Sequence, residues 1–172
     1  MNGKKRSLLK YIGIEKPVNE ITSDEWNTIS FADNLSEEFI REFKNEVFWD
    51  YISKHQNLSE NFIIEFEGYV FWDYICKYQK LSEGFIREHQ DKVDWDNISC
   101  YQKLPDDFLL EFNKMINWHC YFSTQVASYL IMRKFILKSY CDNIEHINNS
   151  KLNNAQKQEI DKLLSLKYIF EK

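Results

Sequence analysis

Acidic side chains recur along this 172-residue chain in a pattern that invites comparison with metal or general acid–base sites. Carboxylates hold cations or transfer protons when several of them converge on one point. Here they recur every 23 residues, which predicts a ladder whose equivalent carboxylates lie one repeat apart, too distant to share an ion. We therefore expect structural roles, as helix-start charges and as hydrogen-bond partners of neighbouring turns or of recurring glutamines. The acids are Glu42, Glu65, Glu88, Glu111, Asp50, Asp73 and Asp96, and the glutamines are Gln56, Gln79, Gln102 and Gln125.

Cysteine and histidine side chains raise a second possibility, a transition-metal site built with His89 and His119. No CxxC pair is present, and the spacing does not match that of known zinc sites. Cys76 replaces a serine found at the same point of two sister repeats, which predicts a small residue in a tight slot. We expect no metal, and four reduced thiols in a cytosolic compartment. The cysteines are Cys76, Cys100, Cys120 and Cys141.

Sequence motifs for catalysis are missing as well. The chain contains no GxxxxGK[ST], GxSxG, HExxH or GxGxxG, and its four glycines are too scattered to build a phosphate-binding loop. These observations disfavour an enzyme, and we expect no cofactor.

The strongest pattern is a 23-residue repeat, marked by tryptophans at exact intervals of that length. Four repeats cover residues 35–57, 58–80, 81–103 and 104–126, and residues 1–34 hold an N-terminal cap and a degenerate half repeat. Residues 127–172 read as a longer C-terminal helical hairpin that caps the stack, so that the whole chain forms one continuous domain. The tryptophans are Trp26, Trp49, Trp72, Trp95 and Trp118.

Each repeat contains signals for two helices. Ser36, Ser59 and Ser82 stand at position 2 as N-caps, with acids directly after them. Apolar residues at positions 5, 6 and 9 form one helical face, and those at 13, 15 and 18 mark a second helix. Helices of roughly 8 to 10 residues are marginal alone, so each must bury its Phe and Trp against neighbours. The fold class predicted is all-α, a short α-solenoid of two-helix repeats.

Position 14 breaks a local rule in the first two repeats. Asp94 and Asn117 are good caps for the second helix, whereas Phe48 and Phe71 forgo a cap worth about 1 kcal/mol. A broken rule without visible compensation marks a candidate functional site. We expect an aromatic patch rimmed by lysines that binds a protein partner; the alternative, rings that simply pack between repeats, stays open. The other members of the patch are Tyr51, Tyr74, Tyr78, Lys54, Lys77 and Lys80.

Charge restricts the choice of partner. The net charge is −5, and residues 35–126 carry nine bases and seventeen acids, a balance of −8. Such an acidic body argues against non-specific binding of phosphate backbones. An RNA- or single-strand-binding repeat protein remains the alternative, with rings stacking on bases and lysines meeting phosphates. No run of 18 apolar residues exists, so we expect no membrane association.

The motif LSxxFI…VxWxxIS…Q, as in "LSEGFIREHQDKVDWDNISCYQK" (81–103), resembles a helical repeat of bacteriophages, giant viruses and AT-rich bacteria. The resemblance covers about residues 26–126, and most such proteins have no known function. The fourth repeat departs from the motif at His119, Cys120 and Tyr121. The resemblance implies a viral or mobile-element protein in the cytoplasm of a host cell. In that setting the expected partner is a host defence factor, such as a CRISPR effector, which the chain would inhibit.

Overall fold

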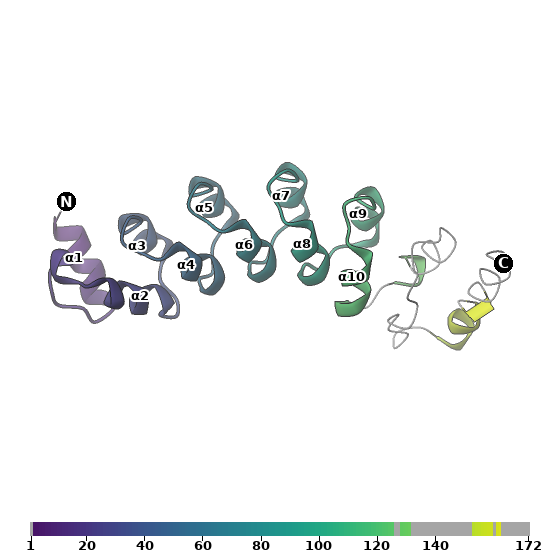
Figure 1. Cartoon of the computed structure of the whole chain (residues 1–172), viewed down its shortest axis with the longest axis horizontal. Coiled ribbons are helices and arrows are strands. Elements are labelled where there is room, and N and C mark those ends of the chain that lie inside the picture. Colours follow the sequence, from purple (N-terminus) through teal and green to yellow (C-terminus); the bar gives the residue numbers. More distant parts are fainter. Residues whose placement is uncertain (1, 126–127, 132–152, 160, 163–172) are drawn as a thin grey trace. The chain divides into compact units, whose positions relative to one another are not determined.

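The computed structural model describes residues 2–125, 128–131, 153–159 and 161–162 (Figure 1). All regular elements in these ranges are helices, and no strand occurs among them. The predicted all-α solenoid of short paired helices is therefore confirmed. The chain divides into two compact units, Met1–Gln79 and Lys80–Lys172. The N-terminal unit contains the first two repeats except Lys80, the last residue of the second repeat, and the C-terminal unit contains the third and fourth repeats.

Every repeat contains one six-residue and one seven-residue helix. In the N-terminal unit, α2 (Ser23–Phe31) and the second helices α4 and α6 form one row, and the first helices α3 and α5 form another (Figure 1). The C-terminal unit arranges α7 and α9, and α8 and α10, in the same manner. The bounds are α3 Glu37–Glu42, α4 Trp49–His55, α5 Glu60–Glu65, α6 Trp72–Tyr78, α7 Glu83–Glu88, α8 Trp95–Tyr101, α9 Asp106–Glu111 and α10 Trp118–Thr124.

The first helices begin where the sequence predicts. Ser36 Oγ accepts the N–H of Phe39 at 3.1 Å, and Ser59 and Ser82 cap α5 and α7 in the same way. Pro105 holds this position before α9 and makes no side-chain cap. A repeated serine thus sets the start of three of the four first helices, because it satisfies an amide that has no partner within the helix.

The helices are shorter than the 8 to 10 residues expected. The first helix ends at position 8, and a turn follows in which the N–H groups of Glu46 and Val47 both donate to the carbonyl of Phe43. The residues directly after Phe43 are polar, so a longer helix would bury no additional apolar surface there. The turn instead brings Val47 into the core, where it is 6% exposed.

The N-terminal part of the chain, where a cap and a half repeat are predicted within residues 1–34, is helical. It consists of α1 (Asn2–Tyr11), the 3-10 helix η1 (Val18–Glu20) and α2 (Ser23–Phe31). Lys4 of α1 pairs with Glu38 at 3.1 Å and with Glu42 at 3.7 Å, so α1 lies beside α3. Thr22 and Glu25 form a capping box that starts α2.

Most of the predicted C-terminal cap, residues 127–172, lies outside the described residues. Residues 128–131 keep the repeat register. Ser128 falls at position 2, and its Oγ accepts the N–H of Ile131, as Ser36 does for Phe39. A helix covers residues 154–159, and Asn153 and Gln156 cap it reciprocally.

Within each unit, tryptophans pack on the following repeat, as predicted. In the N-terminal unit the ring of Trp49 lies 5.2 Å from that of Phe66, and its Nε1 donates to the carbonyl of Lys44 at 2.8 Å. In the C-terminal unit Trp95 lies 5.2 Å from Phe112. Trp49 and Trp95 are half-buried, and no indole ring that the structure describes is exposed. Position 15 of one repeat therefore packs on position 9 of the next.

The glutamine at position 22 ties neighbouring repeats together. Gln56 Oε1 accepts the N–H of Leu35 at 2.8 Å, and its Nε2 donates to the carbonyls of Ser30 and Ala32 at 3.3 and 2.7 Å. Gln79 acts in a similar way: its Oε1 accepts the N–H of Leu58 at 3.1 Å, and its Nε2 donates to the carbonyls of Ser53 and Gln56 at 3.0 and 2.8 Å. These glutamines therefore satisfy backbone groups that the ends of such short helices leave unpaired.

Candidate protein-binding face

Three of the recurring glutamates, Glu42, Glu65 and Glu111, pair with cations and not with the glutamines, which were one of the predicted partners. Arg41 holds Glu65 of the next repeat through two nitrogens at 2.7 to 3.1 Å, and Arg87 pairs with Glu111. The hydrogen bonds from Arg41 lower the pKa of Glu65. Because position 7 of one helix faces position 8 of the next, these ladders are structural, as expected. Among the described residues, no group of three His, Cys, Asp or Glu side chains is placed to bind a metal.

The second helices have their N-caps at position 14, as predicted, and the caps differ as the sequence indicates. Asp94 and Asn117 accept the N–H of the residue three positions on, at 2.7 and 3.1 Å. Phe48 and Phe71 stand at the N-caps of α4 and α6 and provide no side-chain acceptor. Their own N–H groups donate to the serine of the preceding repeat, Ser30 or Ser53, at 2.9 and 3.0 Å. The backbone at position 14 is thus fixed by a hydrogen bond to the preceding repeat, whichever side chain the residue carries. The side chains of Phe48 and Phe71 have no capping role in the helix.

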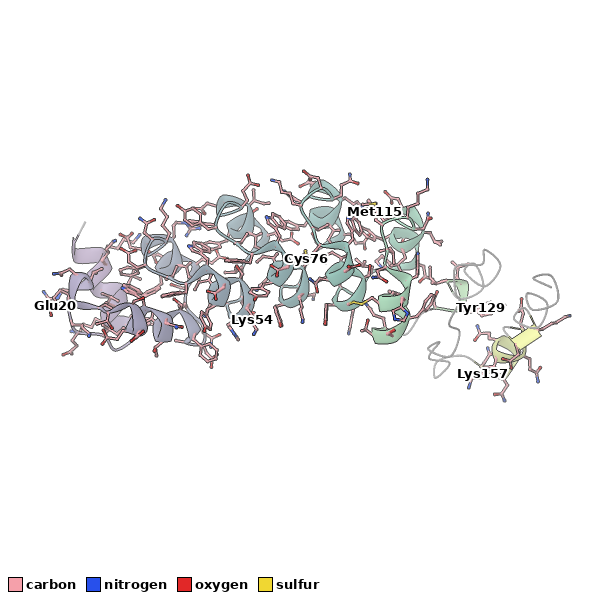
Figure 2. The ribbon with its side chains drawn as sticks, viewed as in Figure 1. Glu20, Lys54, Cys76, Met115, Tyr129 and Lys157 are labelled. Atoms are coloured by element: carbon pink, nitrogen blue, oxygen red, sulfur yellow. A yellow bond between two sulfur atoms is a disulfide. The ribbon has the colours of Figure 1, made fainter. Side chains whose placement is uncertain are left out.

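The rings after Phe71 form a continuous row on α6. The centroid of Phe71 lies 6.0 Å from that of Tyr74, which lies 6.1 Å from that of Tyr78. The ammonium groups of Lys54 and Lys77 stand 5.7 and 5.3 Å from the centroid of Tyr78. Phe71 is 47% and Tyr78 is 44% exposed, so these rings do not simply pack between repeats. Figure 2 shows Lys54 at the edge of α4 that points away from α3 and α5.

A second ring cluster adjoins this row on α2 and α4. The ring of Tyr51 lies 5.7 Å from Phe31 and 6.0 Å from His55, and Phe31 lies 4.7 Å from His55. Phe31 is 55% exposed. Phe31 and His55 are not part of the predicted patch, although extending the repeat back through "WNTISFADN" puts Phe31 at position 20, the place of Lys54 and Lys77. We call the whole set the aromatic face: Phe31, Phe48, Tyr51, Lys54, His55, Phe71, Tyr74, Lys77 and Tyr78.

Two members of the predicted patch stand apart from this exposed row. Phe48 is half-buried, so it contributes less open surface than Phe71. Lys80 is exposed but belongs to the C-terminal unit, so it is not part of the aromatic face as defined. Asp50 and Asp73 occur four residues before Lys54 and Lys77, so each lysine has an acid one helical turn away.

The equivalent surface of the C-terminal unit has different chemistry. Its second helices begin with Asp94 and Asn117, and Asn117 Nδ2 donates to Asp96 Oδ1 at 2.7 Å. Tyr101, at the position of Tyr78, is 48% exposed. The same backbone scheme thus carries rings in one unit and capping polar groups in the other.

The cysteines correct one prediction. Cys100 of α8 and Cys120 of α10 are joined in a disulfide, with their Cα atoms 5.2 Å apart, whereas the sequence predicted reduced thiols. Position 20 of the third repeat faces position 17 of the fourth, which the linear sequence alone does not reveal. Cys76 is fully buried at 0% exposure, as Ser53 and Ser99 are, so the tight-slot prediction is confirmed. Cys141 lies outside the described residues.

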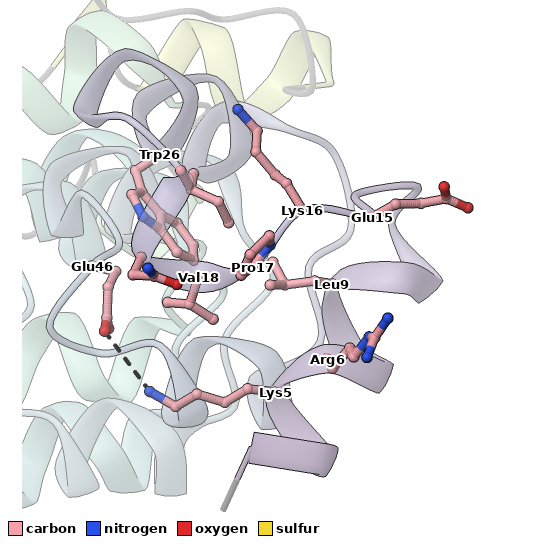
Figure 3. Close-up of a pocket in the computed structure, with 11 residues that line it drawn as sticks. Lys5, Arg6, Leu9, Glu15, Lys16, Pro17, Val18, Trp26 and Glu46 are labelled. Carbon is pink, nitrogen blue, oxygen red and sulfur yellow. Dashed lines mark ion pairs between the residues drawn. The ribbon is translucent and has the colours of Figure 1, made fainter.

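The N-terminal unit also contains an open cavity of about 800 Å³ that the sequence analysis did not anticipate (Figure 3). Leu9, Ile21 and Trp26 supply apolar walls, and Lys5 pairs across it with Glu46 at 3.8 Å. The cavity arises where α1 and the segment before α2 meet, a contact that no local motif encodes.

A bilayer-spanning helix is not found in the part of the chain that the structure describes. Comparison with protein-family models, with curated proteins and with solved structures finds no match to the chain. The resemblance to viral and bacterial helical repeats therefore stays a prediction, and the functional argument rests on the residues themselves.

Proposed function

We propose that the chain is a non-catalytic interaction module that binds a protein partner through its aromatic face. The observation that carries this proposal is the placement of Phe71. A half-exposed phenylalanine occupies the N-cap of α6, where the C-terminal unit has side chains that cap their helices. A capping residue at this position would stabilise the helix, and an exposed ring does not. We therefore attribute the phenylalanine to a role in binding.

The neighbours of Phe71 suit a protein interface. Tyrosine offers a large, rigid contact area and a hydroxyl group that can hydrogen-bond at a partly wet surface. The ammonium groups beside Tyr78 add cation–π contacts that keep its ring in place. In the viral or mobile-element setting that the resemblance implies, the partner is a host defence protein, such as a CRISPR effector, which the bound chain would inhibit.

Site-specific photocrosslinking tests this proposal. A photoreactive phenylalanine analogue is placed at position 71 and, as a matched control, at Tyr101, which has nearly the same exposure in the C-terminal unit. After irradiation in a bacterial lysate, we expect a discrete protein adduct from position 71 and none from position 101. Competition with unlabelled chain should abolish the adduct, whereas competition with the Phe48→Ser plus Phe71→Ser variant should not. Equal adducts at both positions, or none at position 71, would contradict the proposal.

RNA or single-stranded DNA is the second candidate, favoured only by the lysines beside Tyr78. Stacked rings and lysines can hold bases and phosphates, but the acidic balance of residues 35–126 opposes it. A gel shift at low and high salt separates the two functions, because phosphate binding weakens steeply as salt rises. A nucleic-acid complex that weakens as salt rises and depends on Phe71 would support nucleic-acid binding in place of protein binding.

A further inference from the structure

We propose that Cys100 and Cys120 form a reversible thiol–disulfide site, oxidised and reduced by exchange with low-molecular-weight thiols, that fastens α10 to α8. The Cα separation of 5.2 Å lies inside the range that disulfides require, about 4.4–6.8 Å. Both residues are only partly buried, so a small thiol can reach the bond from solvent.

The repeat explains why these two positions meet. In the N-terminal unit the same pair of positions, 20 in one repeat and 17 in the next, is filled once by Phe31 and Tyr51, whose rings lie 5.7 Å apart, and once by Lys54 and Tyr74. The C-terminal unit instead places at these positions a bond that can be made and broken. Two cysteines at facing positions, in place of Phe and Tyr, give this contact a dependence on the redox state.

Other contacts keep the two helices together when the bond is open. The N–H of Asn117 donates to Ser99 Oγ at 2.9 Å, and Thr124 Oγ1 donates to the carbonyl of Cys100 at 2.8 Å. Gln125 Nε2 donates to the carbonyls of Ser99 and Gln102 at 3.1 and 2.6 Å. Reduction is thus expected to loosen α10 without unfolding the repeat, which is what a reversible site needs.

The exchange is balanced in two steps. A thiolate of the small thiol attacks one sulfur, the Cys100–Cys120 bond breaks, and the other cysteine leaves as a thiolate that takes up a proton. A second thiolate attacks the small-thiol sulfur of this mixed disulfide, a small disulfide forms, and the remaining cysteine leaves as a thiolate that is protonated. Two small thiols are oxidised to one small disulfide while the protein gains two electrons and two protons.

The test uses the full chain carrying Cys76→Ser and Cys141→Ser, so that only the proposed pair can react. Cys76→Ser is tolerable because serine occupies that slot in the first and third repeats. The protein is equilibrated in glutathione buffers from reducing to oxidising, and free thiols are alkylated and counted by intact mass. We expect a single reversible transition from two free thiols to none. Thiols that stay free in oxidising buffer, or that link two molecules, would overturn the proposal.

Hydrogen exchange checks the mechanical part of the proposal. In the chain-entropy account, the Cys100–Cys120 bond makes local unfolding of α10 less frequent by a factor on the order of 100, because it closes the loop between the two cysteines. The amides of α10 should therefore exchange more slowly by about that factor in the oxidised protein. In a Cys120→Ser version, exchange in α10 should not depend on the glutathione buffer. Equal exchange in both redox states of the parent, or persistent buffer dependence in the Cys120→Ser protein, would overturn the fastening role.

Discussion

Replacing Gln56 by methionine tests the hydrogen-bond ladder that joins neighbouring repeats. Methionine has similar length and flexibility but neither donates nor accepts comparably, so three backbone groups lose their partner. Two of them, the N–H of Leu35 and the carbonyl of Ser30, are bonded at buried positions, and the carbonyl of Ala32 lies near solvent. Each buried unpaired group costs about 1–3 kcal/mol. We therefore expect a loss of about 3 kcal/mol in the free energy of unfolding.

Urea denaturation followed by far-ultraviolet circular dichroism measures this loss, as a lower midpoint at an unchanged slope. Gln90→Met is the control, because the side chain of Gln90 is exposed and the change should leave the midpoint in place. A Gln56→Met midpoint within error of the parent, or equal shifts in both variants, would show that the ladder does not stabilise the stack.

Three further predictions concern packing, capping and pH. Trp49→Ala removes a ring packed on Phe66 and should lower the free energy of unfolding by about 3 kcal/mol in the same assay; a loss under about 1 kcal/mol would refute the packing argument. Phe71→Ser should be about 1 kcal/mol more stable than Phe71→Ala, because both lose the ring and only serine caps α6; equal stabilities would contradict the cap assignment. A hydrogen bond from Lys16, followed by those from the Thr22 backbone and hydroxyl, lowers the pKa of Glu25 to about 2 from 4.5. Its ionised form therefore stabilises the fold above pH 4.5, and this contribution is lost as pH falls toward 2; nuclear magnetic resonance titration should show the depressed pKa, and a Lys16→Met protein that titrates identically would refute the cause.

The sequence predicts those parts of the fold that depend on residues close together in the chain. A serine followed by acids caps a helix wherever it occurs, and a tryptophan repeated every 23 residues needs a repeated neighbour. Phe48 and Phe71 could be located at helix starts for the same reason, since cap preferences depend on a few adjacent residues.

The features that the sequence analysis missed are contacts between repeats. Whether Glu65 meets a glutamine or Arg41, and whether Cys100 meets Cys120, depends on which positions of neighbouring helices face one another. That relation is set by packing and has no signature within one repeat. The same holds for Phe31, whose membership of the aromatic face follows from its contact with Tyr51.

Binding by two matched tyrosine variants tests the proposed interface most directly. Tyr78 and Tyr101 occupy the same repeat position and are 44% and 48% exposed, but only Tyr78 belongs to the aromatic face. With the partner captured at position 71, Tyr78→Ala should weaken binding roughly 30-fold, as expected for an interface hot spot, and Tyr101→Ala should leave it unchanged. Equal losses in the two variants, or full affinity in Tyr78→Ala, would contradict the assignment of the aromatic face as the binding surface.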